Sequence, residues 1–339
     1  MTERDKLITS IASTCADYRE DDFGKMSPDH VARWSDQFDK GVRLPVLAEL
    51  DHVLKSTYLS KDRITKFLKG LAKENKLAGG DPCKFWKNAN FLKEQKRGHS
   101  QVELLEVFDE VLQDACAFTT SDCGSASGAY IYLDDVIFSG DRVSTDLAAW
   151  ITNKAPARVE LHVVVAGIHA GGEYWLTKDD GKLKKAIKES KKQVTMQIWR
   201  LMNVENSFSR RKNSEVYWPA VLPQDAALSA YMQQHDKYPF TPRTSGGKLG
   251  PFSSEPARQL LEREMLMAGI KICSFSANPS DVVRPLGYSR FGLGFGSTIV
   301  TYRNCPNNCP LALWWGDPSM PKSHPFSKWY PLFPRKTYE

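Results

Sequence analysis

Residues 130–143 read YIYLDDVIFSGDRV, and this stretch decides the fold of the chain. An apolar run at 130–133, rich in β-prone side chains, leads directly into two acids, Asp134 and Asp135. A short loop closes in a Ser-Gly-Asp sequence at 139–141, and a helical pattern begins after it. In an open α/β sheet, ligands bind at the carboxyl ends of the strands, and the N–H groups of such a loop suit a phosphate. The stretch predicts a sugar-phosphate site, with two carboxylates for ribose hydroxyls or a divalent cation.

The composition is that of an ordinary globular protein, since 41% of the 339 residues are hydrophobic and 25% are charged. No apolar run is long enough to span a bilayer, and the charged N-terminus has no signal-peptide pattern. We therefore expect a cytoplasmic protein with no membrane partner, in which the seven cysteines are reduced thiols. A net charge of +6 permits a nucleic-acid or nucleotide partner without requiring one.

Helical and strand-like patterns alternate through the middle of the chain. The spacing of apolar residues predicts helices at 101–117, 143–154 and 182–193, and strands at 129–133, 159–167 and 194–201. The segment 163–166 is apolar throughout, which is typical of a strand buried on both faces of a parallel sheet. The predicted fold class is α/β, a parallel sheet flanked by helices, with a helical N-terminal part and a C-terminal α+β extension.

Breaks in the pattern predict three parts. A Gly-Gly-Asp-Pro sequence at 79–82 ends the helical part, which we place at 1–85, and the sheet-containing core follows at 86–220. The extension, 221–339, is expected to pack on that core.

Within the extension, residues 241–252 are rich in Gly, Pro, Ser and Lys, so we expect a mobile stretch that could close over a ligand. A helix is expected to begin at Ser254 and to end at Gly269. Two strands are expected after it, at 270–275 and 297–302.

Residues 133–141, LDDVIFSGD, resemble the phosphoribosyl pyrophosphate (PRPP) signature of type I phosphoribosyltransferases. The strand before the acids and the helix after the loop favour this site over an ordinary turn, in which acids and small residues are also common. The resemblance implies that Asp134 and Asp135 hold the ribose 2′- and 3′-hydroxyls and are candidate Mg²⁺ ligands. It implies a 5′-phosphate loop made of Ile137, Phe138, Ser139, Gly140, Asp141 and Arg142.

The loop departs from the family pattern at Asp141, where the family usually has glycine. A carboxylate that faced a phosphate would repel it, so Asp141 either points away or the bound anion differs. Arg142 could offset the charge. This departure keeps open a catalytically silent version of the site.

A second loop precedes the helix expected at 101–117, in the position where phosphoribosyltransferases bind pyrophosphate. Gly98 would let the backbone approach a ligand closely, Ser100 could cap the helix, and Arg97 could offset phosphate charge. The loop residues proposed for this role are Arg97, Gly98, His99 and Ser100. An ordinary helix cap with solvated cations explains the same residues equally well.

The rest of the chain carries a second resemblance, to the phosphoribosyltransferase-like effector family of bacterial conflict systems. The residues that carry it are Trp34, Gln37-Phe38, the helix segment 258–262, Gly294-Phe295-Gly296, and the segments 304–310, 313–316 and 331–335. The family commonly has threonine where this chain has Cys305 and Cys309. The resemblance implies a PRPP-like site used in antiviral defence, including beside retron reverse transcriptases.

Together these features predict an effector that binds PRPP with Mg²⁺ and transfers or hydrolyses its ribosyl group, as a toxin in antiphage defence. The alternative is a catalytically silent PRPP- or nucleotide-binding subunit or sensor, held in a complex of a reverse transcriptase with RNA and DNA. A third hypothesis is nucleic-acid binding through the lysine-rich run 182–193 and the basic loop 210–212, although a solvated helix face explains such a run more simply. Cys305 and Cys309 fit a structural turn better than a zinc site.

Overall fold

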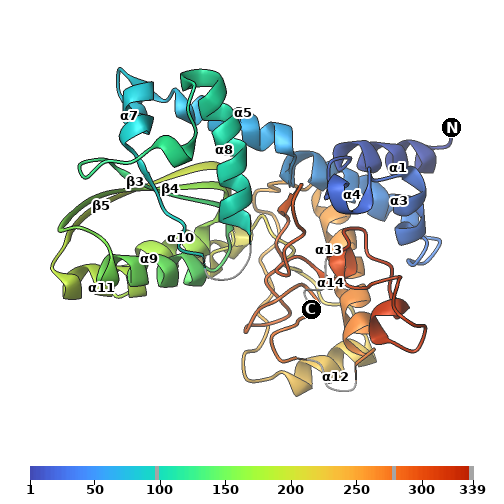
Figure 1. The fold of residues 1–339 in the computed structure, drawn as a ribbon. Coiled ribbons are helices and arrows are strands. Elements are labelled where there is room, and N and C mark those ends of the chain that lie inside the picture. The colour runs from blue at the N-terminus through green and yellow to red at the C-terminus, as the bar shows by residue number, and fades with distance from the viewer. Residues whose placement is uncertain (96–98, 277–279, 336–339) are drawn as a thin grey trace. The chain divides into compact units, whose positions relative to one another are not determined.

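The computed structural model describes residues 1–95, 99–276 and 280–335, and its ribbon is shown in Figure 1. The chain divides into two compact units, one made of Met1–Ser60 with Glu205–Glu339 and the other of Lys61–Val204. Residues 61–85, assigned from the sequence to the helical N-terminal part, lie in the second unit. The division into three parts stays a prediction.

The second unit is built on a four-stranded parallel sheet in the order β2-β3-β4-β5. The strands are β2 (Asn90–Phe91), β3 (Tyr130–Ile137), β4 (Arg158–His169) and β5 (Gln193–Val204). From Leu161 to its end β4 is buried throughout, as the apolar run at 163–166 predicts for a central parallel strand. The predicted α/β class with a parallel sheet is confirmed.

Helices cover both faces of this sheet (Figure 1). Their bounds are α5 (Lys61–Ala72), α6 (Asn75–Ala78), α7 (Pro82–Asn88), α8 (Ser100–Cys116), α9 (Asp141–Asn153), α10 (Ala170–Thr177) and α11 (Lys182–Ser190). A short 3₁₀ helix spans Thr120–Asp122. On α9, Leu147, Trp150 and Ile151 share one face because of their helical spacing, and they pack into the core with β3 and β4. On the opposite face, the rings of Trp86 and Phe108 lie 4.9 Å apart.

The regular secondary structure of the first unit is mainly helical, with α1 (Glu3–Thr14), α2 (Glu20–Phe23), α3 (Pro28–Ser35), α4 (Arg43–Thr57), α12 (Ala226–Gln234), α13 (Glu255–Cys273) and α14 (Leu311–Trp314). Two short strands, β1 (Tyr58–Leu59) and β6 (Val300–Thr301), pair in parallel. The 3₁₀ helices span Phe208–Asn213 and Pro325–Lys328. The hydrophobic core of the first unit contains residues of α1, α4 and α13 and of the aromatic tail, in which Trp329 and Phe333 are buried. No helix in the described part of the chain has the length and apolar character to cross a membrane.

The strand predicted at 270–275 is wrong, because α13 continues through Gly269 to Cys273. Gly269 does not end the helix but lets it pack closely: a Cβ atom there would lie 2.4 Å from the carbonyl oxygen of Pro285. Ile270 and Ile272 are buried along the same helix. The strand predicted at 297–302 is present only at Val300–Thr301.

The expectation that all cysteines are reduced is wrong for one pair. Cys83 at the start of α7 and Cys116 at the end of α8 form a disulfide, with their Cα atoms 5.5 Å apart. The packing of the two helices brings these atoms within the range that a disulfide spans, although 33 positions separate them in the sequence. Five cysteines are free: Cys15, Cys123, Cys273, Cys305 and Cys309.

Candidate functional site

The two acids lie inside β3 rather than after it. The strand was expected to end at residue 133, but it stays paired with β4 up to Ile137, in register with Ile168. Asp134 is 3% exposed, and Asp135 is half-buried. Because side chains alternate along a strand, Asp134 lies on the face of Tyr132 and Asp135 on the opposite face. The two carboxylates are therefore neighbours with different surroundings, not an equivalent pair.

Asp134 is held in an environment that disfavours its charge. Burial, followed by the nearby charge of Asp135, raises the pKa of Asp134 to about 7. A hydrogen bond from Ser100, the N–H of Asp135 at 2.9 Å and the charge of Arg142 act in the opposite direction. The carboxyl group changes its protonation state near neutral pH, in contrast to an ordinary surface aspartate.

Ser100, from the second predicted loop, lies beside Asp134. It was expected to cap α8, but the capping position belongs to His99, whose exposed side chain makes no capping bond, and Ser100 is the first helical residue. Its hydroxyl bonds to the side-chain amide of Gln95 and to Asp134. Of the four residues proposed here, Arg97 and Gly98 lie outside the described residues.

Two glutamines near this helix start were not predicted. Gln95 Oε1 accepts a hydrogen bond from the N–H of Gln101 at 3.3 Å, and Gln101 Oε1 accepts one from the N–H of Gln95 at 2.9 Å. Gln101 is buried, and its Nε2 has no hydrogen-bond partner among the described residues. This exchange positions Ser100 beside Asp134. No spacing rule in the sequence signals it.

The loop after β3 has a shape that only glycine allows at one position. Gly140 adopts a left-handed conformation, with φ of 75°, and caps α9. A Cβ atom at Gly140 would lie 2.4 Å from the carbonyl oxygen of Gly172 in α10. A Cβ atom at Gly172 would in turn lie 2.2 Å from the carbonyl oxygen of Phe138. The loop therefore packs tightly on α10, and Ser139 is exposed beside the start of α9.

Asp141 is paired with a lysine from another helix. Its carboxylate lies 2.6 Å from Nζ of Lys182 at the start of α11, and the same ammonium group lies 3.3 Å from Oγ1 of Thr145. Both charged side chains are more than half exposed. Arg142, next in the chain, is exposed and acts electrostatically on Asp134. The charge of Asp141 is thus offset by Lys182, a contact between distant residues that the sequence pattern did not reveal.

A buried histidine, His169, contacts the end of β3 and the first residue of the loop. His169 Nδ1 lies 3.2 Å from the carbonyl oxygen of Ile137, and its ring lies 5.1 Å from that of Phe138. Burial lowers the pKa of His169 to about 4, so the ring is neutral near neutral pH. Because a carbonyl oxygen only accepts, Nδ1 carries the proton. His169 fixes the end of β3 and the start of the loop.

The donor set suits a cation that arrives with phosphate groups. Among the described residues, no cluster of three or more His, Cys, Asp or Glu side chains could hold a metal ion. Asp134 and Asp135 supply two carboxylates. Mg²⁺ is typically held by one or two carboxylates together with substrate phosphates and water. Because the two side chains lie on opposite faces of β3, one of them at a time fits such an ion as its protein ligand.

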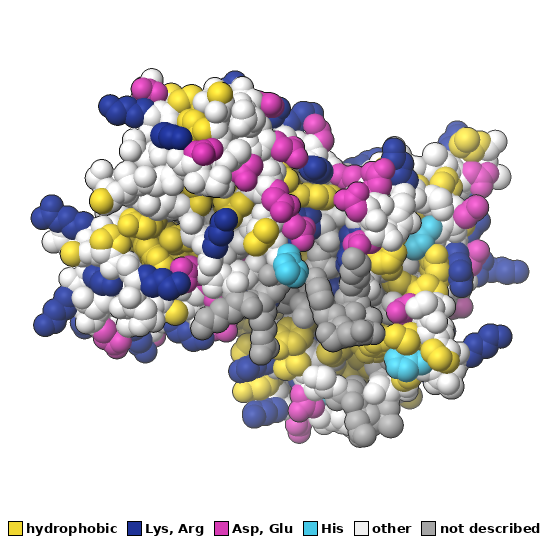
Figure 2. All heavy atoms as spheres, in the orientation of Figure 1, with side chains coloured by type: hydrophobic (Ala, Val, Ile, Leu, Met, Phe, Trp, Pro, Cys, Tyr) yellow, Lys and Arg dark blue, Asp and Glu magenta, His cyan; other side chains and the backbone are white. Residues whose placement is uncertain are grey.

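The lysine side chains of helix α11 form a face that is exposed to solvent. Leu183 and Ala186 are its buried residues, and Ile187 packs against the core. Figure 2 shows Lys and Arg side chains gathered where Figure 1 places α11 and β5. Lys182, at the start of this run, instead belongs to the loop at Asp141.

A parallel sheet with adjacent acids on β3, followed by a glycine-capped loop and a helix, defines a phosphoribosyltransferase-like protein. The model of the PRTase-CE family matches residues 31–335. The chain belongs to this family of phosphoribosyltransferase-like effector domains. No curated protein and no solved structure gives a significant match to the chain.

The residues outside the PRPP signature that carry the family resemblance pack together in the first unit. Trp34 Nε1 donates to the carbonyl oxygen of Ala312 at 2.8 Å, and the Gln37 side chain bonds to both main-chain groups of Tyr330. Cys305 and Cys309 are buried, and the N–H of Cys309 bonds to the carbonyl oxygen of Pro306, as a turn requires. These residues build the core of their unit.

Proposed function

We propose that the chain binds PRPP at the carboxyl end of β3 and, with Mg²⁺, transfers or hydrolyses its ribosyl group as an effector in antiphage defence. The observation that carries the proposal is the convergence of Asp134, Ser100 and the tightly packed loop ending at Gly140. Membership of an effector family supports the biological role. A cytoplasmic location, where PRPP is available, is part of the proposal.

Each side chain has a defined task in this reaction. Asp134 and Asp135 bind the ribose hydroxyls, and their charge favours the positive character that develops at the anomeric carbon. The N–H groups of the loop and of the first turn of α9 bind the 5′-phosphate, and Lys182 adds a positive charge beside Asp141. Ser100 and the start of α8 face the pyrophosphate, which leaves with the electron pair of the broken carbon–oxygen bond.

Mg²⁺, when bound with PRPP, would supply positive charge to the pyrophosphate oxygens. Either Asp134 or Asp135 would hold it, since their side chains lie on opposite faces of β3. Because Asp134 has a pKa near 7, both the metal and the ribose hydroxyls meet a carboxyl group whose charge depends on pH. We therefore expect binding to strengthen as Asp134 ionises.

The test is the consumption of PRPP and the release of pyrophosphate by the full chain with Mg²⁺. The variant D134N/D135N keeps the size of both side chains and removes their charge, so we expect loss of turnover by at least a hundredfold, in line with charged transition-state contacts. The matched control is Asp179→Asn, which removes an exposed carboxylate. Full turnover in D134N/D135N would exclude this site as the active site.

A catalytically silent binding subunit, held by a reverse transcriptase with RNA and DNA, is the second candidate. Asp141 favours it, because this acid stands in the phosphate loop where the family usually has glycine. Binding of PRPP without pyrophosphate release, together with a defence phenotype that survives D134N/D135N, would identify this role. Loss of the phenotype with loss of turnover would identify the enzyme.

A further inference from the structure

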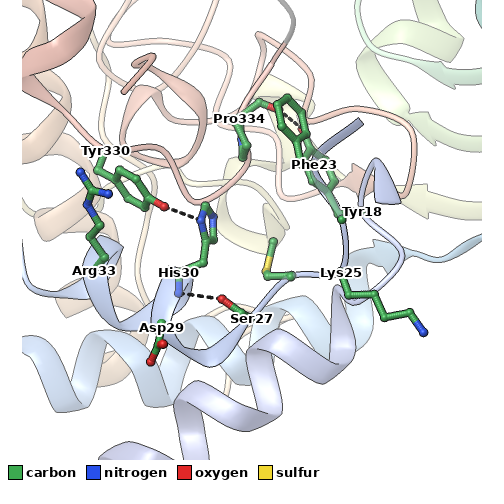
Figure 3. Close-up of a pocket in the computed structure, with 11 residues that line it drawn as sticks. Tyr18, Phe23, Lys25, Ser27, Asp29, His30, Arg33, Tyr330 and Pro334 are labelled. Carbon is green, nitrogen blue, oxygen red and sulfur yellow. Dashed lines mark hydrogen bonds between the residues drawn. The ribbon is translucent and has the colours of Figure 1, made fainter. Parts of the chain in front are cut away.

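A cavity of about 320 Å³ opens in the unit made of 1–60 and 205–339, and no residue of the PRPP site lines it. Its lining comes from Tyr18, the end of α2 with the loop after it, the first turns of α3, and the tail at 330 and 334 (Figure 3). The volume lies at the lower end of the range for small-molecule pockets. A site here would be separate from the proposed function.

One wall of the cavity is fixed by His30. Its Nε2 lies 2.7 Å from the carbonyl oxygen of Leu332 and its Nδ1 lies 2.7 Å from the hydroxyl of Tyr330, a bond drawn in Figure 3. Because the carbonyl only accepts, Nε2 donates, and Nδ1 accepts from the Tyr330 hydroxyl. Burial lowers the pKa of His30, which keeps the ring neutral. Both ring nitrogens of His30 are therefore used in hydrogen bonds to the tail.

The tail is held at two further points. The side chain of Gln37 bonds to the main chain of Tyr330 at 2.7 and 2.8 Å. The hydroxyl of Tyr18 donates to the carbonyl oxygen of Pro334 at 3.0 Å and accepts from the N–H of Cys305 at 3.1 Å. A ligand would therefore meet a preformed wall, which reduces the entropy lost on binding.

The two ends of the cavity differ in chemistry. Phe23 lies at one end, and 49% of its surface is exposed. Arg33 lies at the other end, with its guanidinium 4.1 Å from the centre of the Tyr330 ring. Arg33 is exposed and makes no ion pair or hydrogen bond that is seen within the described part of the chain. The cavity thus offers an aromatic surface and, beyond it, a guanidinium group whose N–H donors are available.

The other charged side chains at the cavity do not face its interior. In Figure 3 the ammonium group of Lys25 and the carboxylate of Asp29 both point away from the His30 and Tyr330 rings. Arg19, whose guanidinium lies 5.2 Å from the centre of the Phe23 ring, is paired with Asp22. Arg33 is therefore the cation beside the cavity that has no ion pair among the described residues. A guanidinium group binds carboxylate or phosphate through two parallel hydrogen bonds, and aromatic rings stack favourably on Phe and Tyr.

We propose that this cavity is a second ligand site, which takes a small molecule that joins a planar aromatic ring to an anionic group, as a nucleoside monophosphate does. The ring lies against Phe23 and Tyr330, and the anion bonds to Arg33. The His30 ring holds the wall and makes no charged contact with the ligand.

The experiment is titration calorimetry of the full chain with AMP, GMP, CMP and UMP, with adenosine and ribose 5-phosphate as partial ligands. We expect at least one nucleotide to bind, and both partial ligands to bind at least tenfold more weakly. Arg33→Gln is expected to weaken binding about tenfold through the lost charged hydrogen bonds, and Phe23→Ala about fivefold through lost stacking. Lys25→Gln removes the same charge at the cavity rim and is expected to leave binding unchanged.

The variant D134N/D135N separates this cavity from the PRPP site, because nucleotide binding at the cavity is expected to persist in it. Arg33 and Phe23 are exposed, and unchanged thermal unfolding of their variants will show that the fold is intact. Absence of binding at millimolar nucleotide overturns the proposal. So does binding that R33Q and F23A leave intact, binding that D134N/D135N abolishes, or ribose 5-phosphate binding as tightly as the nucleotides.

Discussion

Burial of Asp134 disfavours the charged form of its carboxyl group. The side chain is 3% exposed, and burial raises its pKa from 3.8 to about 7. The sequence predicted an acid at the end of a strand and made this residue a candidate, whereas the structure places it inside β3. The sequence could not indicate the burial, because burial depends on how Ser100 and the start of α8 cover the end of β3. Local pattern reveals residue type and spacing, whereas a pKa depends on the folded surroundings.

The raised pKa makes the stability of the protein fall with pH. Below pH 4 Asp134 is protonated in both the folded and the unfolded state, so no penalty arises. Between pH 4 and 7 the carboxyl group is ionised in the unfolded state but still protonated in the folded state, so the free energy of unfolding falls as the pH rises. Above pH 7 both states are ionised and the free energy of unfolding no longer changes through this group. The stability of Asp134→Asn relative to the wild type is therefore expected to rise by on the order of 4 kcal/mol as the pH increases from 4 to 8.

Chemical unfolding at several pH values measures this change. The control is Asp179→Asn, an exposed carboxylate in the same unit, for which we expect no comparable pH-dependent gain. A constant difference between D134N and the wild type across the range would contradict the burial of a charged group at this position.

Gly140 tests whether the loop after β3 is as tightly packed as the contacts indicate. Gly140→Ala introduces a Cβ atom at φ of 75° and 2.4 Å from the oxygen of Gly172, so the backbone must move. We expect a loss of stability of about 3 kcal/mol, from the left-handed backbone together with the clash, and a loss of PRPP binding.

Gly79→Ala is a control for backbone strain without a clash. Gly79 lies in the same unit with φ of 66° and ψ of −158°, and nothing lies within 4 Å of its Cβ position. Only the conformational cost of this glycine-restricted region remains there, about 1–3 kcal/mol. A loss of about 1 kcal/mol or less in Gly140→Ala, measured by denaturant unfolding, would show that the contact with Gly172 does not constrain the loop.

At the scale of the elements, periodicity predicted most of the second unit. The helices at α8, α9 and α11 and the strands β3, β4 and β5 all fall on predicted segments, because each buries one apolar face or a continuous apolar run. The failures have tertiary causes. Gly269 lies inside α13 because the main chain at Pro285 packs directly against it, and not because the helix ends there. The pairing of Asp141 with Lys182 joins two helices that are distant in sequence.

The disulfide between α7 and α8 yields a prediction about these elements. Closing a loop of 33 positions restricts the unfolded chain and contributes about 3–4 kcal/mol. Cys83→Ser with Cys116→Ser is expected to lose that amount, and a reducing agent is expected to lower the stability of the wild type equally. The double variant should not respond to the reducing agent. A response in the double variant, or none in the wild type, would show that this disulfide does not hold the two helices.

At the scale of the whole molecule, the two units have separate hydrophobic cores. The core of the first unit surrounds a buried ionic cluster in which Glu262 bonds to Arg258 at 2.8 Å and to Arg243 at 3.3 Å. Arg258 also donates to the carbonyl oxygens of Ser214 and Val216. The cluster therefore joins α13 to the segment at 214–216, which no sequence pattern predicted.

Glu262→Gln removes the one fully buried acid of this cluster and leaves the buried guanidinium group of Arg258 without a carboxylate, while Arg243 keeps only its pair with Glu255. We expect a loss of about 3–5 kcal/mol, as for other broken buried ion pairs, against about 1 kcal/mol or less for Glu264→Gln, whose partner Arg263 is exposed. Hydrogen exchange locates the effect. Faster exchange is expected in α13 and at 214–217, while α8 and β3 keep the protection of the wild type, because their core is separate. Uniformly faster exchange in both units would mean that they unfold as one cooperative body.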